Sequence, residues 1–242
     1  MVALLLEDAL HRRDPVHEAF DAPVVLGEPW SVIDDVMAAR PAGVSGGRVR
    51  RGLLAIAVGL ATGALTLLGQ AVLGADANRL ANSGAIWVTV AFGIGAVMAS
   101  DREAVVAGTA TLLLALVGYQ LAAWAAHASL GTSGLVIWSG TAVVGGPVFG
   151  LAGRRWRVDT GRSRVLAIAL LGAVFVAEGA YTLVSIPNLA LTGWIEVIAG
   201  LGVPFLLGRD RRERLSALVV LVPLSLLGLL AYEVISRLFL VI

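Results

Sequence analysis

The sequence contains no cysteine and no lysine, it has only three histidines, and charged residues fill just 14% of its 242 positions. Without cysteine there are no disulfides, thiolate metal sites or iron–sulfur clusters. Without lysine there is no P-loop nucleotide motor and no lysine Schiff base. Since two of the histidines precede residue 20, only His127 lies in the apolar part, too few for a histidine-based haem or zinc site. We therefore expect no cofactor and no metal.

What the sequence has instead is apolar residues, which make up 58% of the chain and give a mean hydropathy of +0.87. A soluble domain would carry roughly 25% charged residues. The composition therefore places the chain in the membrane class, with the lipid bilayer as its surroundings. Its formal net charge of +1 says little about partners, because the basic and acidic residues are separated by position along the chain. We expect no nucleic-acid partner for a chain of this class.

Seven stretches have about the 20 apolar residues that a helix needs to cross the hydrocarbon core. They are residues 52–74, 84–100, 104–126, 134–153, 165–186, 191–208 and 217–239. The second and sixth are short, so we expect them to be tilted or partly re-entrant. The predicted fold class is an all-α polytopic membrane helix bundle with brief connections between the helices.

Arginines predict the orientation of the bundle. Thirteen fall before the first span or in the loops after the second, fourth and sixth spans, against only Arg79 and Arg237 on the other side. The thirteen are Arg48, Arg50, Arg51, Arg102, Arg154, Arg155, Arg157, Arg162, Arg164, Arg209, Arg211, Arg212 and Arg214. Because cytoplasmic loops collect basic residues, we expect a multi-pass protein of the cell membrane with the N-terminus inside and the C-terminus outside.

The first 46 residues differ in character, since they hold many of the acidic residues and no long apolar run. The segment SVIDDVMAAR favours a short amphipathic turn capped by Ser31, and PAGVSGG is typical of a linker. We expect residues 1–46 to form a loosely ordered cytoplasmic segment and residues 47–242 to form the transmembrane domain.

Spans two to seven are similar enough to suggest three copies of one hairpin. GIGAVMASDR, GGPVFGLAGRR and LGVPFLLGRDR each end an inward-going helix with small residues and an arginine turn. Internal repeats are common in transporter folds. Glycine-rich helices and arginine turns also arise independently in many multi-span proteins, so both explanations stay open.

With this orientation, the strongly polar residues of the spans fall in the outer half of the bundle. We take five of them as candidate ligand-binding residues: Gln70, Gln120, Glu178, Tyr181 and Glu196. A carboxylate inside a span is costly. Glu178 must therefore be protonated, paired with Arg79 or Arg237, or wetted by a cavity; a purely structural hydrogen bond between helices is the other interpretation. Glu196 is shallow enough to be only interfacial.

The first span carries a stripe of small and polar residues, Gly59, Gly63, Thr66 and Gln70, at alternating spacings of four and three. Its glycines form a small-xxx-small surface on which another helix can pack closely. We expect this Gly59/Gly63 face to meet a neighbouring helix or a membrane protein partner.

Two further patterns point to structure rather than chemistry. Glu233 and Arg237 have the spacing of a local ion pair on one helix. GTSG at residues 131–134 resembles the nucleophile motif of rhomboid proteases, but the later spans contain no histidine to act as its base. We find no complete catalytic set and expect no enzyme activity.

Three stretches, ANRLANSGAIWVTVAF, GGPVFGLAGRRWR and FVAEGAYTLV, resemble an uncharacterised family of multi-span membrane proteins from high-GC bacteria. The resemblance covers roughly the first to the sixth span and implies a topology but no chemistry. The chain is also loosely similar to the substrate-binding subunits of energy-coupling-factor transporters, which normally have six helices.

These observations favour an integral membrane protein that binds or transports a small solute through an outward-facing polar site. The alternative is a structural or assembly subunit of a membrane complex, whose polar residues only bind helices together.

Overall fold

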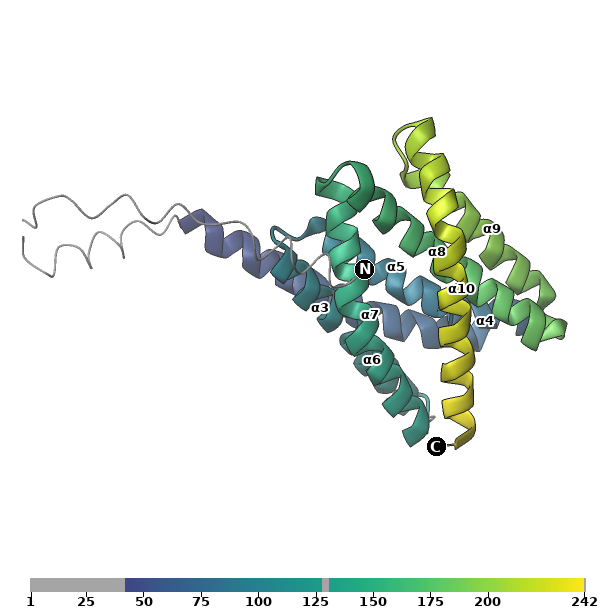
Figure 1. The fold of residues 1–242 in the computed structure, drawn as a ribbon. Coiled ribbons are helices and arrows are strands. Elements are labelled where there is room, and N and C mark those ends of the chain that lie inside the picture. The colour runs from purple at the N-terminus through teal and green to yellow at the C-terminus, as the bar shows by residue number, and fades with distance from the viewer. Residues whose placement is uncertain (1–41, 128–130, 242) are drawn as a thin grey trace, which may run out of the picture. The chain divides into compact units, whose positions relative to one another are not determined.

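The computed structural model describes residues 42–127 and 131–241, and every regular element within these ranges is a helix (Figure 1). The elements are α3 (Ala42–Val72), α4 (Ala75–Ala81), α5 (Gly84–Val97), α6 (Asp101–Ala125), α7 (Thr132–Val158), α8 (Gly161–Ser185), the 3₁₀ turn η1 (Pro187–Leu189), α9 (Ala190–Leu207) and α10 (Arg211–Val241). Seven stretches of this described part are long and apolar enough to cross a membrane. The predicted all-α bundle with seven spans is therefore confirmed.

The start of α3 corrects one prediction. The chain is helical from Ala42, so residues 42–47 belong to α3 and are not a linker. Arg48 and Arg51 explain why, because both pair with Glu103 of α6 at 3.1 Å and hold the beginning of α3 against that helix. The turn predicted around Ser31 lies outside the described residues.

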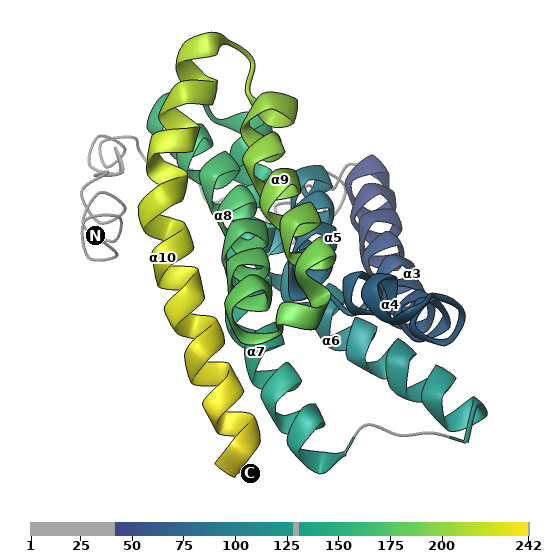
Figure 2. The same cartoon turned by 90° about the vertical axis from the view of Figure 1, so that its right-hand side faces the viewer.

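Helix α8 is the centre of the bundle. It packs against α5, α7, α9 and α10, and it lies between α10 and α9 in Figure 2. Ile168 and Ala169 on this helix are fully buried and belong to the main apolar core. Any polar group on the inner part of α8 is therefore kept from lipid and has to find its partners on the neighbouring helices.

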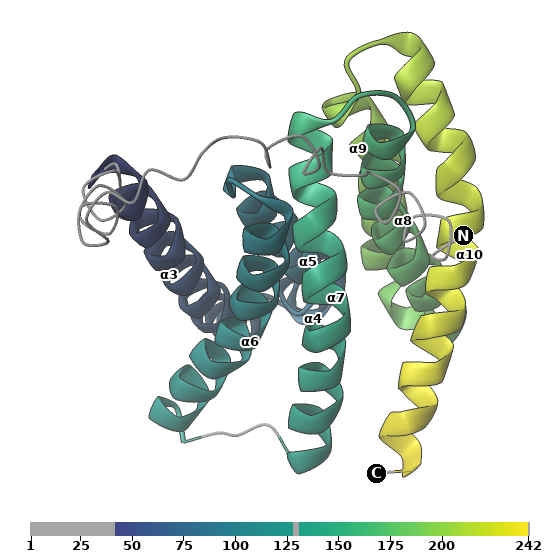
Figure 3. The same ribbon diagram turned by 60° about the vertical axis from the view of Figure 1, so that its left-hand side comes forward.

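Helix α3 lies at the edge of the bundle against α6, where the two backbones approach closely (Figure 3). A Cβ added at Gly63 would lie only 1.9 Å from the carbonyl oxygen of Ala115, and one at Gly59 only 2.7 Å from that of Thr111. The predicted close packing of this face is thus confirmed. It is formed with α6 of the same chain, however, so the face is not free for a separate membrane protein.

The second span is a broken helix. Asn82 ends α4, and Ser83 has extended backbone angles and begins α5. Helix α5 has 14 residues, a length of about 21 Å, which is short of the roughly 30 Å of a hydrocarbon core. Ser83 and Ala85 are fully buried. The break therefore lies inside the protein, the only place where non-helical backbone at membrane depth is tolerated.

The hairpin turns α5–α6, α7–α8 and α9–α10 lie at one end of the bundle, here called the arginine end. The α7–α8 turn is shorter than expected, since α7 runs to Val158 and α8 begins at Gly161. All five arginines expected in the loop at residues 154–164 are therefore helical. Arg154, Arg155 and Arg157 lie near the end of α7, and Arg162 and Arg164 lie in the first turn of α8.

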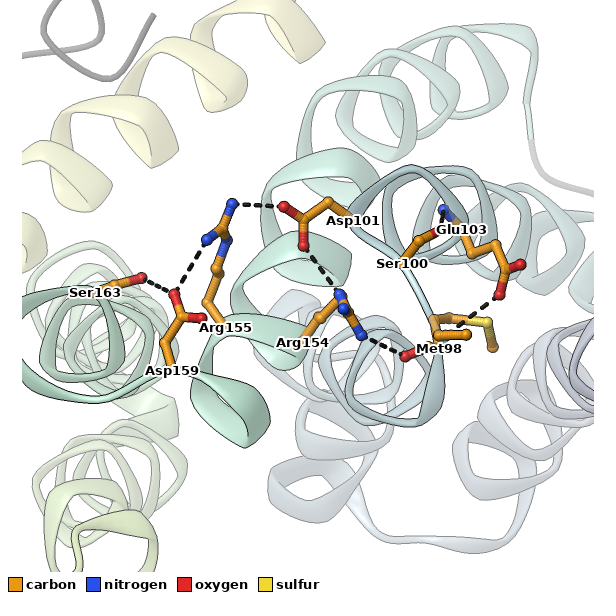
Figure 4. A network of polar contacts seen from close by, with 9 residues as sticks. Met98, Ser100, Asp101, Glu103, Arg154, Arg155, Asp159 and Ser163 are labelled. Carbon is orange, nitrogen blue, oxygen red and sulfur yellow. Dashed lines mark hydrogen bonds and ion pairs between the residues drawn. The ribbon is translucent and has the colours of Figure 1, made fainter. Parts of the chain in front are cut away.

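A polar network joins the first two turns (Figure 4). Asp101 accepts hydrogen bonds from Arg154 and Arg155, and Arg155 also contacts Asp159, which accepts a bond of 2.6 Å from Ser163. Burial alone would raise the pKa of Asp159, but the hydrogen bonds from Ser163 and Arg155 outweigh it and hold this pKa below its usual value. The carboxylate of Asp159 therefore stays charged near neutral pH, and the network ties α6 to α7 and α8.

Several of these arginines also cap helix ends. Arg154 donates to the carbonyl of Met98 at 2.8 Å and Arg157 donates to that of Ala96 at 3.0 Å, both at the end of α5. Arg164 is buried, pairs with Glu213, and donates to the carbonyls of Trp156 and Leu207 at the ends of α7 and α9. Cations at these positions satisfy free carbonyls and complement the negative end of the helix dipole.

Helices α6 and α10 begin with one shared pattern, which bears on the repeat hypothesis. Ser100 caps the amide of Glu103, whose carboxylate accepts from the amide of Ala99. At α10, Asp210 and Glu213 make the same reciprocal bonds with the amides of Glu213 and Arg209. This is a variant of the capping box. Helix α8 lacks it, since the side chain of its N-cap residue Thr160 makes no capping hydrogen bond.

Gly63 offers a direct test of the α3–α6 packing. Gly63→Ala should lower the melting temperature in detergent, because overpacking of a close contact costs about 1–3 kcal/mol and here the contact is with backbone. Gly52→Ala on the same helix is the control, since its added Cβ would meet nothing within 4 Å. Equal melting temperatures for the two variants would contradict the packing.

Candidate functional site

Glu178 is buried in α8, with 2% of its surface exposed, and it faces the start of α5. Its carboxylate accepts three hydrogen bonds: from the hydroxyl of Ser83 at 2.8 Å, from the amide of Gly84 at 3.1 Å and from the amide of Ala85 at 2.8 Å. All three donors lie at the break in the second span. Glu178 therefore caps the buried N-terminus of α5.

This arrangement explains why a carboxylate lies inside a span. The first amides of a helix have no partner within the helix, and here they lie where no bulk water reaches them. An acidic group at a helix N-terminus satisfies these amides and is stabilised by the positive end of the helix dipole. Of the interpretations left open by the sequence, the structural hydrogen bond between helices is the one that the geometry shows. Arg237 is not the partner of Glu178, because it pairs with Glu233 at 2.9 Å.

Glu196 of α9 lies beside this cap. It is 1% exposed, so the expectation of an interfacial side chain was wrong. The reason is the close contact of α8 and α9 at Gly179 and Gly193, which brings Glu196 against α8. Its Oε2 atom accepts from the hydroxyl of Thr182 at 3.5 Å, and it interacts electrostatically with Glu178 and with Arg79.

Tyr181 reaches the cluster only through a second tyrosine. Its ring stacks on that of Tyr232 of α10, with centroids 5.8 Å apart. The Tyr232 hydroxyl in turn lies next to Gly84, beside the carboxylate of Glu178. Glu178, Glu196 and Tyr181 are thus brought together from α8 and α9 around the α5 cap, as three of the five predicted residues.

The other two predicted residues lie elsewhere. The side chain of Gln70 in α3 accepts from the hydroxyl of Tyr119 at 2.9 Å, and its backbone carbonyl accepts from Asn78 at 2.7 Å. Gln120 follows Tyr119 on α6 and is half-buried. This second group is separated from the carboxylates by a hollow of about 20 Å³, which Gly84 and Tyr119 help to line. The hollow is large enough for about one water molecule. The carboxylates are therefore buried in the protein and do not line an open polar depression.

A much larger space adjoins the cap on its other side. A groove of about 560 Å³ runs between α7 and α10 and reaches α5 and α8. Its lining is apolar for most of its length and includes Val144, Phe149 and Ile235. Gly84 and Tyr232, the two residues next to Glu178, also line it. We call this space the α7/α10 groove.

Two contributors to this region were missed by the sequence reasoning. Ser83 supplies the shared hydroxyl, and its position before an apolar run is a recognisable N-cap signal. Trp138 of α7 lies 6.2 Å from the ring of Trp87 and lines both the hollow and the groove. No sequence signal placed it there. In the described residues, no group of three or more histidine, aspartate or glutamate side chains lies close enough to hold a metal ion.

The fold and the buried polar cluster define the chain as an integral, multi-pass helical membrane protein. It belongs to DUF6518, a family of unknown function, which it matches over residues 44–238. This agrees with the resemblance seen in the sequence, and the match begins near the first span. No curated protein and no solved structure matches the chain.

The cap gives a prediction for Glu178→Gln. The amide has one acceptor oxygen where the carboxylate has two, and its NH₂ group would face donors at the start of α5. Each buried donor left without a partner costs about 1–3 kcal/mol, so the variant should melt at a clearly lower temperature in detergent. Glu233→Gln is the matched control, because its exposed ion pair is worth about 0–1 kcal/mol. A Glu178→Gln variant as stable as the control would contradict the cap.

Proposed function

We propose that this is a non-enzymatic protein of the cell membrane that binds or carries a small solute in the α7/α10 groove. The observation that carries the proposal is the groove itself, whose volume of about 560 Å³ falls in the usual range for small-molecule sites. It joins the buried polar cluster at Gly84 and Tyr232. An apolar pocket with a few convergent polar groups is the usual form of such a site.

The lining limits the chemistry of the solute. Val136 and Val144 border the groove and are more than half exposed on the lipid-facing side of the bundle. The hydroxyl of Thr141 already donates to its own helix. The polar contact offered to a ligand is therefore concentrated at Tyr232. This favours a membrane-soluble molecule with an apolar body and one hydrogen-bonding end, entering from the bilayer.

The predicted orientation of the bundle indicates which leaflet of the membrane the groove would face. If the arginine end faces the cytoplasm, as the basic bias indicates, the groove lies in the outer half of the membrane. The solute would then exchange with the outer leaflet. The predicted polar residues contribute indirectly, because Glu178 and Tyr181 hold Gly84 and Tyr232 in place at the polar end of the groove.

A structural or assembly subunit remains the second candidate. One observation favours it: the hydrogen bonds of Glu178 are accounted for by the α5 cap alone, without any ligand. In that case the groove would be filled by lipid without preference, and a large partner would copurify with the protein.

A variant that fills the groove separates the two functions. Gly140 lines the groove, and an added Cβ there meets nothing within 4 Å, so Gly140→Phe should fold and occupy the space. The probe is a long-chain alcohol that carries a photoreactive diazirine, added to the protein in vesicles. We expect its label on residues 136–145 and 228–238 of wild type, and at least a severalfold loss of this label in Gly140→Phe.

Gly93→Phe is the control, because an added Cβ at Gly93 also meets nothing within 4 Å and Gly93 does not line the groove. It should label like wild type. Label spread evenly over all lipid-facing helices, or unchanged by Gly140→Phe, would overturn the proposal and favour the assembly subunit.

A further inference from the structure

The two buried carboxylates at the start of α5 differ in how well their oxygens are satisfied. Glu178 accepts three short hydrogen bonds. Glu196 accepts a long contact from Thr182, at 3.5 Å, and is also influenced by the Ser83 hydroxyl, but its Oε1 atom is buried with no hydrogen-bond partner among the described residues. Buried carboxylate oxygens normally meet donors or cations. The unpartnered Oε1 therefore indicates a missing positive or donating group.

The charges around Glu196 point the same way. The charged side chains that act on it are Glu178 of α8 and Arg79 of α4. The other titratable groups near the cluster are Tyr181 and Tyr232, while Glu233 pairs with Arg237 at the exposed surface. Helix α5 contributes no charged residue. Two carboxylates thus face one guanidinium. The first amides of α5 and the positive end of its dipole are directed at Glu178, so the charge of Glu196 is the less compensated one in a site shielded from water.

We propose that Glu196, together with Glu178, Ser83 and Thr182, forms a binding site for one small monovalent cation, a proton or a sodium ion. One positive charge balances the cluster. A proton on Glu196 would remove its buried negative charge, whereas a sodium ion would use the hard oxygen ligands that these carboxylates and hydroxyls supply. The site lies behind the α5 cap and does not depend on any solute in the α7/α10 groove.

The test is the melting temperature of the detergent-solubilised full chain between pH 5 and pH 9, in sodium chloride or in choline chloride at equal concentration. A ligand that binds only the folded state stabilises it in proportion to its occupancy. If the site holds a proton, wild type should lose about a few degrees as pH rises, in both salts. If it holds sodium, wild type should melt about a few degrees higher in sodium than in choline at alkaline pH.

Glu196→Gln should remove either response, because it keeps the size of the side chain and supplies a donor without the charge. Glu233→Gln is the control and should respond like wild type. Parallel behaviour of wild type and Glu196→Gln in every condition would overturn the proposal.

A second measurement serves if Glu196→Gln does not fold. Infrared spectra of wild type should show either the carbonyl stretch of a protonated carboxylic acid at neutral pH or a shift of the carboxylate bands on exchange of choline for sodium. The lack of both would overturn the proposal. Because neither measurement involves the photoreactive alcohol, the cation site and the solute groove can fail independently.

Discussion

The structure depends on one constraint: a helix begins inside the protein at membrane depth, and its first amides need partners. Glu178 supplies them from the neighbouring helix α8, with Ser83 completing the cap. Arg154 and Arg157 satisfy carbonyls at the other end of α5. This short helix therefore has an acid at its N-terminus and bases at its C-terminus, which is the arrangement that the helix dipole favours.

Close packing makes this arrangement possible. Gly179 and Gly193 let α8 and α9 approach until an added Cβ at Gly179 would lie 2.5 Å from a backbone oxygen. This contact places Glu196 beside Glu178 and closes the cluster to lipid. At the arginine end, the turns are held together by ion pairs and by arginines on free carbonyls. One end of the bundle is thus fixed by charge networks, while the opposite end contains the broken helix, the carboxylate pair and the groove.

The sequence predicted the number of spans and the close face of α3 because length, hydropathy and glycine spacing are local properties. It also predicted the ion pair of Glu233 with Arg237, whose partners lie on one helix. It identified Glu178 as the residue to explain, but not its partners, because backbone amides carry no sequence signature and Ser83 is far away in the chain. Glu196 was misjudged for a related reason. The neighbouring helix that buries it could not be known from its position in the sequence.

The repeat hypothesis is instructive in the same way. Gly118 and Gly228 occupy positions in α6 and α10 that correspond, counted from each N-cap, to Glu178 in α8. If the three hairpins are copies, only the middle one has an acid at this position. Among the described residues, the buried start that uses this acid is that of α5. Local sequence signals predict what the hairpins share, such as small residues and arginine turns. The site depends instead on Glu178 and on the buried start of α5, which the hairpins do not share.

The most direct measurement of the central claim is amide hydrogen exchange at Gly84 and Ala85, observed by NMR on isotope-labelled protein in detergent micelles. If Glu178 caps α5, both amides should exchange slowly in wild type and much faster in Glu178→Ala. Ile94, near the arginine-capped end, should keep its protection. Unchanged exchange at Gly84 and Ala85 in the variant would contradict the account.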